Sequence, residues 1–305
     1  MYGRVHTTLM LGAALIAACV PAACGPNSPT GPRDGLAVVA TTTQLGDFAR
    51  AVGGDRASVT QLLQPNADPH DYEPTPGAVG AIADASVVLE NGMGLDDWLG
   101  DAISNAGSRA TRIVTTADVA TRRGAGGDPD PHVWLDPRNA IIMVRAIETA
   151  FVAAAPEDAA HFHANADAYV RQIDVMDAEL ATRLDAVPAS RRTIVTDHDA
   201  FGYFAGRYGI TIVGTVVPSL STQAEASAKA VTDLAATIRS QGVRAIFTEA
   251  SIDPKIERAL ADETGVRLGD PLYGDALGGP DTPAASYLGM MRTNMDAIIN
   301  GIGTG

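Results

Sequence analysis

Cysteine is nearly absent from the 305-residue sequence, which has only Cys19 and Cys24, both close to its N-terminus. The rest of the chain therefore has no thiol for a disulfide or a thiolate metal site. Lysine is equally rare, with Lys229 and Lys255, so arginine supplies nearly all of the positive charge. The 22 basic and 36 acidic residues give a formal net charge of −14, which repels nucleic acid. We expect no nucleic acid among its partners.

The signatures of common nucleotide-binding and hydrolytic sites are also missing. The sequence has no GxGxxG after a predicted strand, no GxxxxGK phosphate loop, no GxSxG elbow and no HExxH pair. A hydrophobic content of 46% and a charged content of 19% still predict a globular protein with one or two sizeable cores. The chemistry must therefore be sought in other residues.

The N-terminus has the pattern of an export signal followed by a tether. Arg4 precedes the apolar run 8–18, which is too short to span a bilayer as a helix. The run ends in IAAC, which resembles a bacterial lipobox, so we expect 1–18 to be a lipoprotein signal peptide and Cys19 to be lipidated, with Cys24 as the alternative. A cleaved secretory signal without lipid is the other reading. The Pro/Gly/Ser-rich residues 19–35 predict a flexible tether, and hence an extracytoplasmic protein anchored to the cell membrane.

From residue 36 onward, short β-branched runs alternate with longer amphipathic segments, which is typical of βαβ units. Apolar residues recur at helical spacing from Ala166 to Val187, which predicts one long helix. We expect an N-terminal α/β lobe at 36–160, a linking helix at 161–188 and a C-terminal α/β lobe at 189–305. Within the last, a helix is expected after Thr222, with Glu225 completing a capping box. The predicted fold class is α/β, with two Rossmann-like lobes joined by a single long rigid helix.

Three of the six histidines follow predicted strands. His70 and His132 lie in loops stiffened by prolines, and His198 ends the strand TIVTDH. Ligands in open α/β sheets bind beyond the carboxyl ends of strands, and imidazole is the commonest ligand of first-row metals. The three histidines therefore indicate a site for Zn²⁺ or a neighbouring metal. The others are His6 in the signal and the helix-surface pair His161 and His163.

These motifs closely resemble those of the solute-binding proteins of zinc and manganese ABC transporters, the ZnuA/TroA-type family. The resemblance extends from about Val38 to Ile299. It rests on HDYEPTP at 70–76, HVWLDP at 132–137 and HDAFGYF at 198–204, with further matches at 221–228, 247–249 and 272–277. It implies the metal-type periplasmic binding protein fold, with the ion held at the lobe interface by two residues from each lobe.

The resemblance also implies the ligands, which are His70, His132, His198 and Asp275. Three imidazoles and one carboxylate fill a tetrahedral Zn²⁺ shell and leave no place for a catalytic water, so we expect no enzyme. His198 stands where manganese members usually have glutamate, which favours zinc over the alternative, Mn²⁺. The histidine-rich loop of many zinc members is missing, because 121–130 contains no histidine. The candidates to orient the ligands are Glu73, Asp136, Asp197 and Glu249.

The expected function is capture of zinc outside the cytoplasm and its delivery to an ABC transporter permease by a monomer that a lipid anchor keeps close to that partner. One alternative is a zinc-dependent hydrolase with Glu249 or Asp197 as general base, which a fourth ligand at Asp275 would exclude. The other is a surface adhesin of the same fold, which no residue supports or opposes.

Overall fold

The computed structural model describes residues 1–3, 35–124 and 126–303. Residues 34–305 form one compact unit. Nearly all of the predicted signal peptide and tether, with Cys19, Cys24 and His6, lies outside the described residues. Among the helices that are described, none is long and apolar enough to cross a membrane.

The N-terminal lobe is built on a parallel sheet with strand order β2-β1-β3-β4. Its strands are β1 (Leu36–Ala40), β2 (Ala57–Gln61), β3 (Val87–Glu90) and β4 (Thr111–Val114). In register, Val38 of β1 lies between Val59 of β2 and Val87 of β3. The lobe also contains α1 (Thr43–Gly53), α2 (Pro76–Asp84), α3 (Leu99–Ala106) and α4 (Pro137–Ala154).

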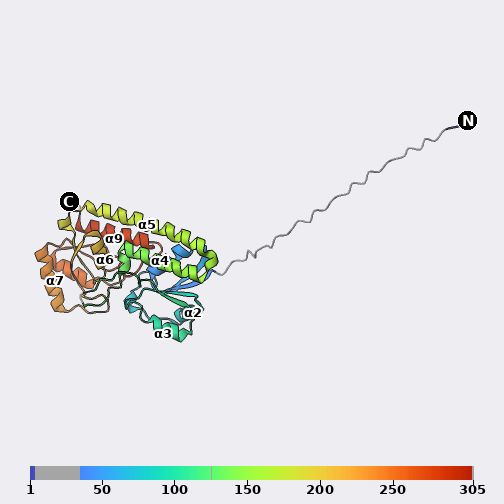
Figure 1. The fold of residues 1–305 in the computed structure, drawn as a ribbon. Helices are drawn as coiled ribbons and strands as arrows, with labels where there is room; N and C mark the ends of the chain where they lie inside the picture. The colour runs from blue at the N-terminus through green and yellow to red at the C-terminus, as the bar shows by residue number, and fades with distance from the viewer. Residues whose placement is uncertain (4–34, 125, 304–305) are drawn as a thin grey trace. The chain divides into compact units, whose positions relative to one another are not determined.

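Alternate residues of the central strand β1 face two different layers of helices. Val38 belongs to a core cluster shared with α1 and α4, whereas Val39 belongs to one shared with α2 and α3. Figure 1 shows α2 and α3 on the side of the sheet away from α4. Because both faces of the sheet are covered, its central strands are almost entirely apolar, with Glu90 at the end of β3 as the exception.

The C-terminal lobe repeats this topology, with strand order β6-β5-β7-β8 and all neighbours parallel. The strands are β5 (Thr193–Thr196), β6 (Thr211–Thr215), β7 (Ala245–Ile246) and β8 (Arg267–Leu268). Its helices are α6 (Gly202–Tyr208), α7 (Ala228–Gln241), α8 (Lys255–Thr264) and α9 (Tyr287–Ile302). In each sheet the direction of the strand order reverses between the strand that comes first in the sequence and the one that comes third. Open α/β sheets bind ligands at such a switch point.

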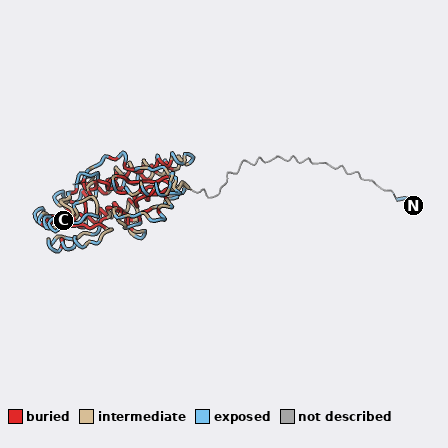
Figure 2. Tube along the Cα trace, turned by 90° about the horizontal axis from the view of Figure 1, so that it is seen from below, coloured by how far each residue is buried: buried red, intermediate tan, exposed pale blue. Residues whose placement is uncertain are grey.

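Helix α5 (Ala159–Asp185) joins the lobes and passes alongside both of them (Figure 1). Its buried residues include Phe162, which packs edge-on against Phe151 of α4, and Met176 and Leu180 further along. Figure 2 shows the buried segments inside both lobes and the exposed ones at the periphery. Two α/β lobes bridged by one long helix confirm the predicted fold class. Short 3-10 turns occur at Gly54–Arg56, Pro69–Asp71, Val133–Leu135, Pro156–Asp158 and Ala189–Arg191.

The predicted capping box before α7 is wrong. The helix begins at Ala228, and the hydroxyl of Ser227 accepts the capping hydrogen bond from the Ala230 amide at 3.1 Å. Thr222 instead donates its hydroxyl to Asp68 Oδ2 in the N-terminal lobe, at 2.6 Å. Serine caps a helix as well as threonine does, so two candidates five residues apart cannot be ranked by sequence alone.

We predict that Phe162→Ala lowers the free energy of unfolding by about 3–5 kcal/mol, because it removes a buried ring and leaves a cavity. The control is Val175→Ala on the same helix, where the side chain is 66% exposed. That change should stay within about 0.5 kcal/mol of the parent. Chemical denaturation of both variants measures the difference, and similar losses would contradict the assignment of this face of α5 to the core.

Candidate metal centre

Four side chains from distant parts of the chain converge between the lobes: His70, His132, His198 and Asp275. One candidate ligand atom from each lies within 4.8 Å of all the others. The Nε2 atoms of His70 and His132 are 3.3 Å apart, and those of His132 and His198 each lie 3.3 Å from Asp275 Oδ1. Around a tetrahedral Zn²⁺ with bonds of about 2.0–2.1 Å, ligand atoms are separated by roughly 3.3 Å. The spacing therefore fits such an ion.

The two N-terminal histidines are fixed by the same local device, the tripeptide Asp-Pro-His. Asp68 Oδ1 accepts the His70 amide at 2.8 Å, and Asp130 Oδ1 accepts the His132 amide at 3.0 Å. Proline between them restricts the backbone. The aspartate and proline together hold each imidazole in a rigid turn after the sheet.

Asp130 also determines how the His132 ring is turned. Its Oδ1 lies 2.8 Å from His132 Nδ1, which leaves Nε2 facing the centre. Its Oδ2 accepts a hydrogen bond from Arg122 at 2.6 Å. A carboxylate behind a ligand imidazole fixes its tautomer and raises its basicity. Sequence reasoning missed Asp130, although the repetition of Asp-Pro-His before both histidines was a signal that could have identified it.

The four residues predicted to orient the ligands have different surroundings. Asp197 Oδ1 lies 3.1 Å from His198 Nδ1, so it is placed for that role. Glu249 is buried and accepts the Gly274 amide at 2.9 Å, which holds the main chain next to Asp275.

The other two candidates are not placed to orient a ligand. Asp136 caps α4 and pairs with Arg138, because a carboxylate just before a helix N-terminus satisfies the free amides there. Glu73 is exposed and makes no hydrogen bond or ion pair among the described residues. Their nearness in sequence to a ligand was therefore misleading.

The four residues influence one another's pKa values. Burial lowers the pKa of His70 to about 4. Burial also opposes charge on His132 and His198, but the Asp275 carboxylate, with Asp130 and Asp197, outweighs it and raises both pKa values. Asp275, which burial alone would shift upward, has a pKa held well below its usual range by those imidazoles. Without an ion, protons on imidazoles offset the buried carboxylate.

Several polar atoms of this cluster have no hydrogen-bond partner among the described residues. His198 Nε2 and both carboxylate oxygens of Asp275 are buried without a hydrogen bond among the described residues. Each such buried group costs on the order of 1–3 kcal/mol. Donor atoms that converge, lack partners and are spaced like a coordination shell fit a bound cation.

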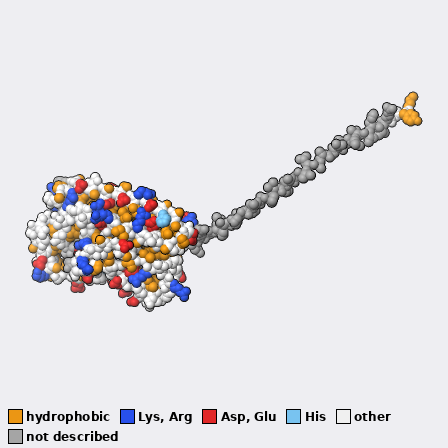
Figure 3. Space-filling model, viewed as in Figure 1, with side chains coloured by type: hydrophobic (Ala, Val, Ile, Leu, Met, Phe, Trp, Pro, Cys, Tyr) orange, Lys and Arg blue, Asp and Glu red, His pale blue; other side chains and the backbone are white. Residues whose placement is uncertain are grey.

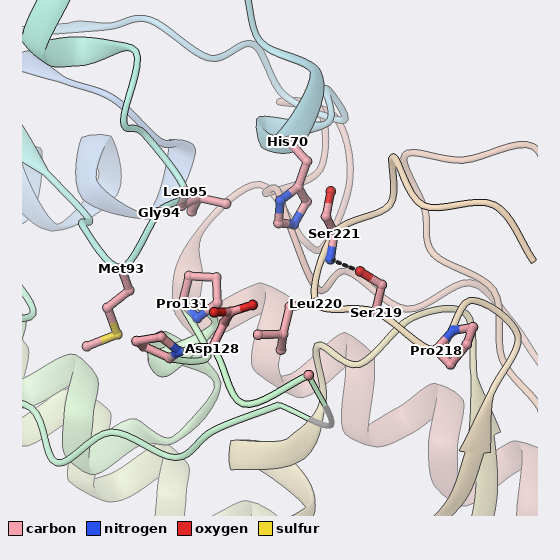
Figure 4. A pocket seen from close by; sticks show the side chains of 12 residues that line it. His70, Met93, Gly94, Leu95, Asp128, Pro131, Pro218, Ser219, Leu220 and Ser221 are labelled. Carbon is pink, nitrogen blue, oxygen red and sulfur yellow. Dashed lines mark hydrogen bonds between the residues drawn. The ribbon is translucent and has the colours of Figure 1, made fainter.

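A cavity of about 320 Å³ gives access to the cluster. His70 lines it, and the other three residues do not. Figure 4 shows His70 projecting from its 3-10 turn toward Ser221, with Leu220 on the facing loop and Met93 and Asp128 on the far side. An ion that travels through this cavity therefore meets His70 first.

The remaining described histidines lie away from the centre, on the surface of α5. His161 Nε2 is 3.3 Å from Asp55 Oδ1, and His163 Nδ1 is 2.6 Å from Glu148 Oε1. They carry out ordinary surface pairing, as the sequence indicated. Figure 3 shows acidic and basic side chains mixed over the visible face rather than gathered by sign.

A centre of three histidines and one carboxylate between two α/β lobes, bridged by one long helix, defines a metal-type solute-binding protein. The chain belongs to the ZnuA family, described as "zinc-uptake complex component A periplasmic", which matches residues 38–301. The family consists of substrate-binding proteins for metal transport and not of enzymes, so the hydrolase alternative falls away.

Individual relatives bind different metals. The chain is 32% identical over 285 residues to the iron-binding protein YfeA of Yersinia pestis, covering 92% of this chain and 91% of YfeA. It is 32% identical over 299 residues to the manganese-binding lipoprotein MntA of Bacillus subtilis, covering 95% and 97%. The periplasmic zinc-binding protein TroA of Treponema pallidum superposes with a TM-score of 0.82 at 31% identity, covering 87% of this chain and 98% of TroA. The family resemblance is confirmed, whereas the choice of metal is not decided by the relatives.

We predict that Asp130→Asn weakens metal affinity about 10–100-fold, because the His132 ring loses the carboxylate that orients it. Asp136→Asn is the matched control. Asparagine also caps helices, so this variant should lose under about 1 kcal/mol of stability and keep its metal affinity. Competition titration with a chromophoric chelator measures both, and equal affinities would contradict the role of Asp130.

Proposed function

We propose that this protein captures a divalent transition-metal ion outside the cytoplasm and delivers it to the permease of an ABC transporter. Zinc is the ion we favour, and Mn²⁺ is the alternative. The observation that carries the proposal is the convergence of four potential ligand atoms from His70, His132, His198 and Asp275, three of the four residues being fully buried. His198 Nε2 and both Asp275 oxygens also lack a hydrogen bond among the described residues. Lipoprotein relatives support a membrane-anchored protein, for which Cys19, or else Cys24, is the proposed lipidated residue.

The chemistry of the donors supports zinc over manganese. Imidazole nitrogens favour Zn²⁺, whereas Mn²⁺ prefers a shell richer in oxygen. A second carboxylate, Glu249, is fully buried nearby, but burial and the charge of Asp275 raise its pKa well above the usual range. One of its oxygens is also occupied by the Gly274 amide. Glu249 is thus engaged with the main chain next to Asp275, and the converging set itself contains one carboxylate, that of Asp275.

The shape of the centre suits a carrier. Four protein ligands complete the shell of a tetrahedral ion and leave no position for a reactive water. The ion would instead pass through the cavity at His70 when it is taken up or released. We propose that the protein acts as a monomer. No observation on the described residues favours the adhesin alternative.

The ligand set is tested by elemental analysis of the purified protein and by competitive titration of the metal-free form with Zn²⁺ and Mn²⁺. We expect one zinc per chain that excess Mn²⁺ does not displace. His132→Ala and His198→Ala should each cost at least about a hundredfold in affinity, more than the loss of an outer partner. His161→Ala, a surface histidine of α5, should change nothing. The absence of stoichiometric metal would refute the proposed function, and a preference for Mn²⁺ would refute the choice of zinc.

Affinity should rise with pH, because an imidazole must lose its proton before it binds a metal. His132 and His198 have raised pKa values, so protons compete with the ion at both positions as the pH falls. His70, with a pKa of about 4, competes little above about pH 5. Calorimetry in buffers of different ionisation enthalpy should therefore count one to two protons released per ion near neutral pH. A flat affinity between about pH 5 and 7.5 would contradict a site with three histidines.

A further inference from the structure

The segment that carries Asp275 changes partners between the lobes at Gly274. Before that point its hydrogen bonds go to the C-terminal lobe. The Leu272 amide donates to the Thr248 carbonyl at 2.8 Å, and the Gly274 amide donates to Glu249 Oε2 at 2.9 Å. Gly274 has no room for a side chain, because a Cβ there would lie 2.6 Å from Glu249 Oε2.

From the Gly274 carbonyl to Leu277, the main-chain hydrogen bonds found among the described residues go to the N-terminal lobe. Trp134 Nε1 donates to the Gly274 carbonyl at 2.9 Å, and Gln44 Nε2 donates to the Asp275 carbonyl at 3.1 Å. The amide of Asn66 donates to the Leu277 carbonyl at 3.0 Å. Trp134 follows His132 by two residues and Asn66 precedes His70 by four. The Asp275 main chain is thus bonded to the same segments that hold the two N-terminal histidines.

The first turn of α1 provides the central part of this connection. Thr43 Oγ1 accepts the Leu277 amide at 2.8 Å and donates to Gln44 Oε1 at 3.0 Å. The oxygen of the Gln44 amide is therefore engaged, and its nitrogen faces the Asp275 carbonyl. Both side chains are buried, with 1% and 0% exposure. Buried polar groups of this kind need partners, and these two find theirs on the Asp275 segment.

His198 differs from the other three residues. It lies two residues after the end of β5 of the C-terminal lobe, and its carbonyl accepts the Thr196 hydroxyl at 3.1 Å. The next amide, that of Asp199, donates to the Ser219 carbonyl in the same lobe at 2.9 Å. The main chain around His198 therefore moves with the C-terminal sheet.

We propose that Gln44 and Thr43 are positioning residues that fix Asp275 to the N-terminal lobe, so that His198 alone parts from the ion when the lobes separate. This inference rests on the proposed function, since it assumes that the four side chains share one ion. Asp275, although it comes from the C-terminal part of the chain, stays with His70 and His132. The ion is then left on two imidazoles and one carboxylate.

The test is Gln44→Met, which keeps the size of the side chain but removes its hydrogen bonds. We expect it to bind one Co²⁺ per chain, to shift the visible absorption bands of that ion, and to raise its dissociation rate constant roughly tenfold, the effect of one lost buried hydrogen bond. The control is Asn165→Leu, which removes an amide-to-carbonyl bond of 3.0 Å to Val52 at the other end of α1. Its dissociation rate and spectrum should equal those of the parent.

A second pair of variants separates the hydrogen bond from folding. Thr43→Val keeps the shape of the side chain and removes the acceptor for the Leu277 amide, so it should also speed dissociation, whereas Thr43→Ser should restore the parent rate. Thermal melting shows which variants are folded, and Thr43→Val carries the test if Gln44→Met is not. Folded variants that bind one ion and release it at the rate of Asn165→Leu would overturn this inference. Failure of the parent to bind Co²⁺ or Zn²⁺ would instead refute the proposed function.

Discussion

The rest of the structure depends on one buried negative charge, the carboxylate of Asp275. It lies between the lobes with no exposed surface, and neither of its oxygens has a hydrogen-bond partner among the described residues. An isolated ion of this kind is costly to bury unless positive charge lies beside it. Three imidazoles lie within 4 Å of it. Those of His132 and His198 have raised pKa values and can hold a proton beside the carboxylate, and all three can share a bound cation with it. The facing loops of the two lobes bring these imidazoles and the carboxylate together.

The general architecture follows from periodicity in the sequence. Alternating β-branched and amphipathic segments predict parallel sheets covered by helices, and the long stretch of apolar residues at helical spacing predicts α5. The ends of α5 differ by two or three residues from the predicted 161–188, because fraying and a following proline, Pro188, limit a helix in ways that periodicity does not show. The start of α7 was missed because Thr222 has a partner in the other lobe, which no local pattern reports.

Some residues of the candidate site could be predicted from the sequence pattern, and others could not. His70 and His198 lie in the segments after β2 and β5, and His132 lies in the loop between β4 and α4. The convergence of such segments follows from the topology of parallel sheets. Asp275 lies in an irregular segment between β8 and α9, and only the family resemblance pointed to it. Nearness in sequence to a ligand does not predict the role of a carboxylate. Asp130 and Asp136 are both near His132, yet Asp130 supports its ring and Asp136 caps α4. Whether a carboxylate supports the ring or caps the helix depends on where the backbone turns.

The 27-residue helix α5 has a consequence for how far this protein has to move. At 1.5 Å per residue it extends about 40 Å, and it packs along both lobes, which limits wide opening. A metal ion does not need wide opening, because its bonds tolerate changes of only about 0.2 Å in length. A relative shift well under the width of a water molecule is enough to break one coordination bond. The stiff connection therefore suits a protein that binds a single metal ion rather than a molecule that it must enclose.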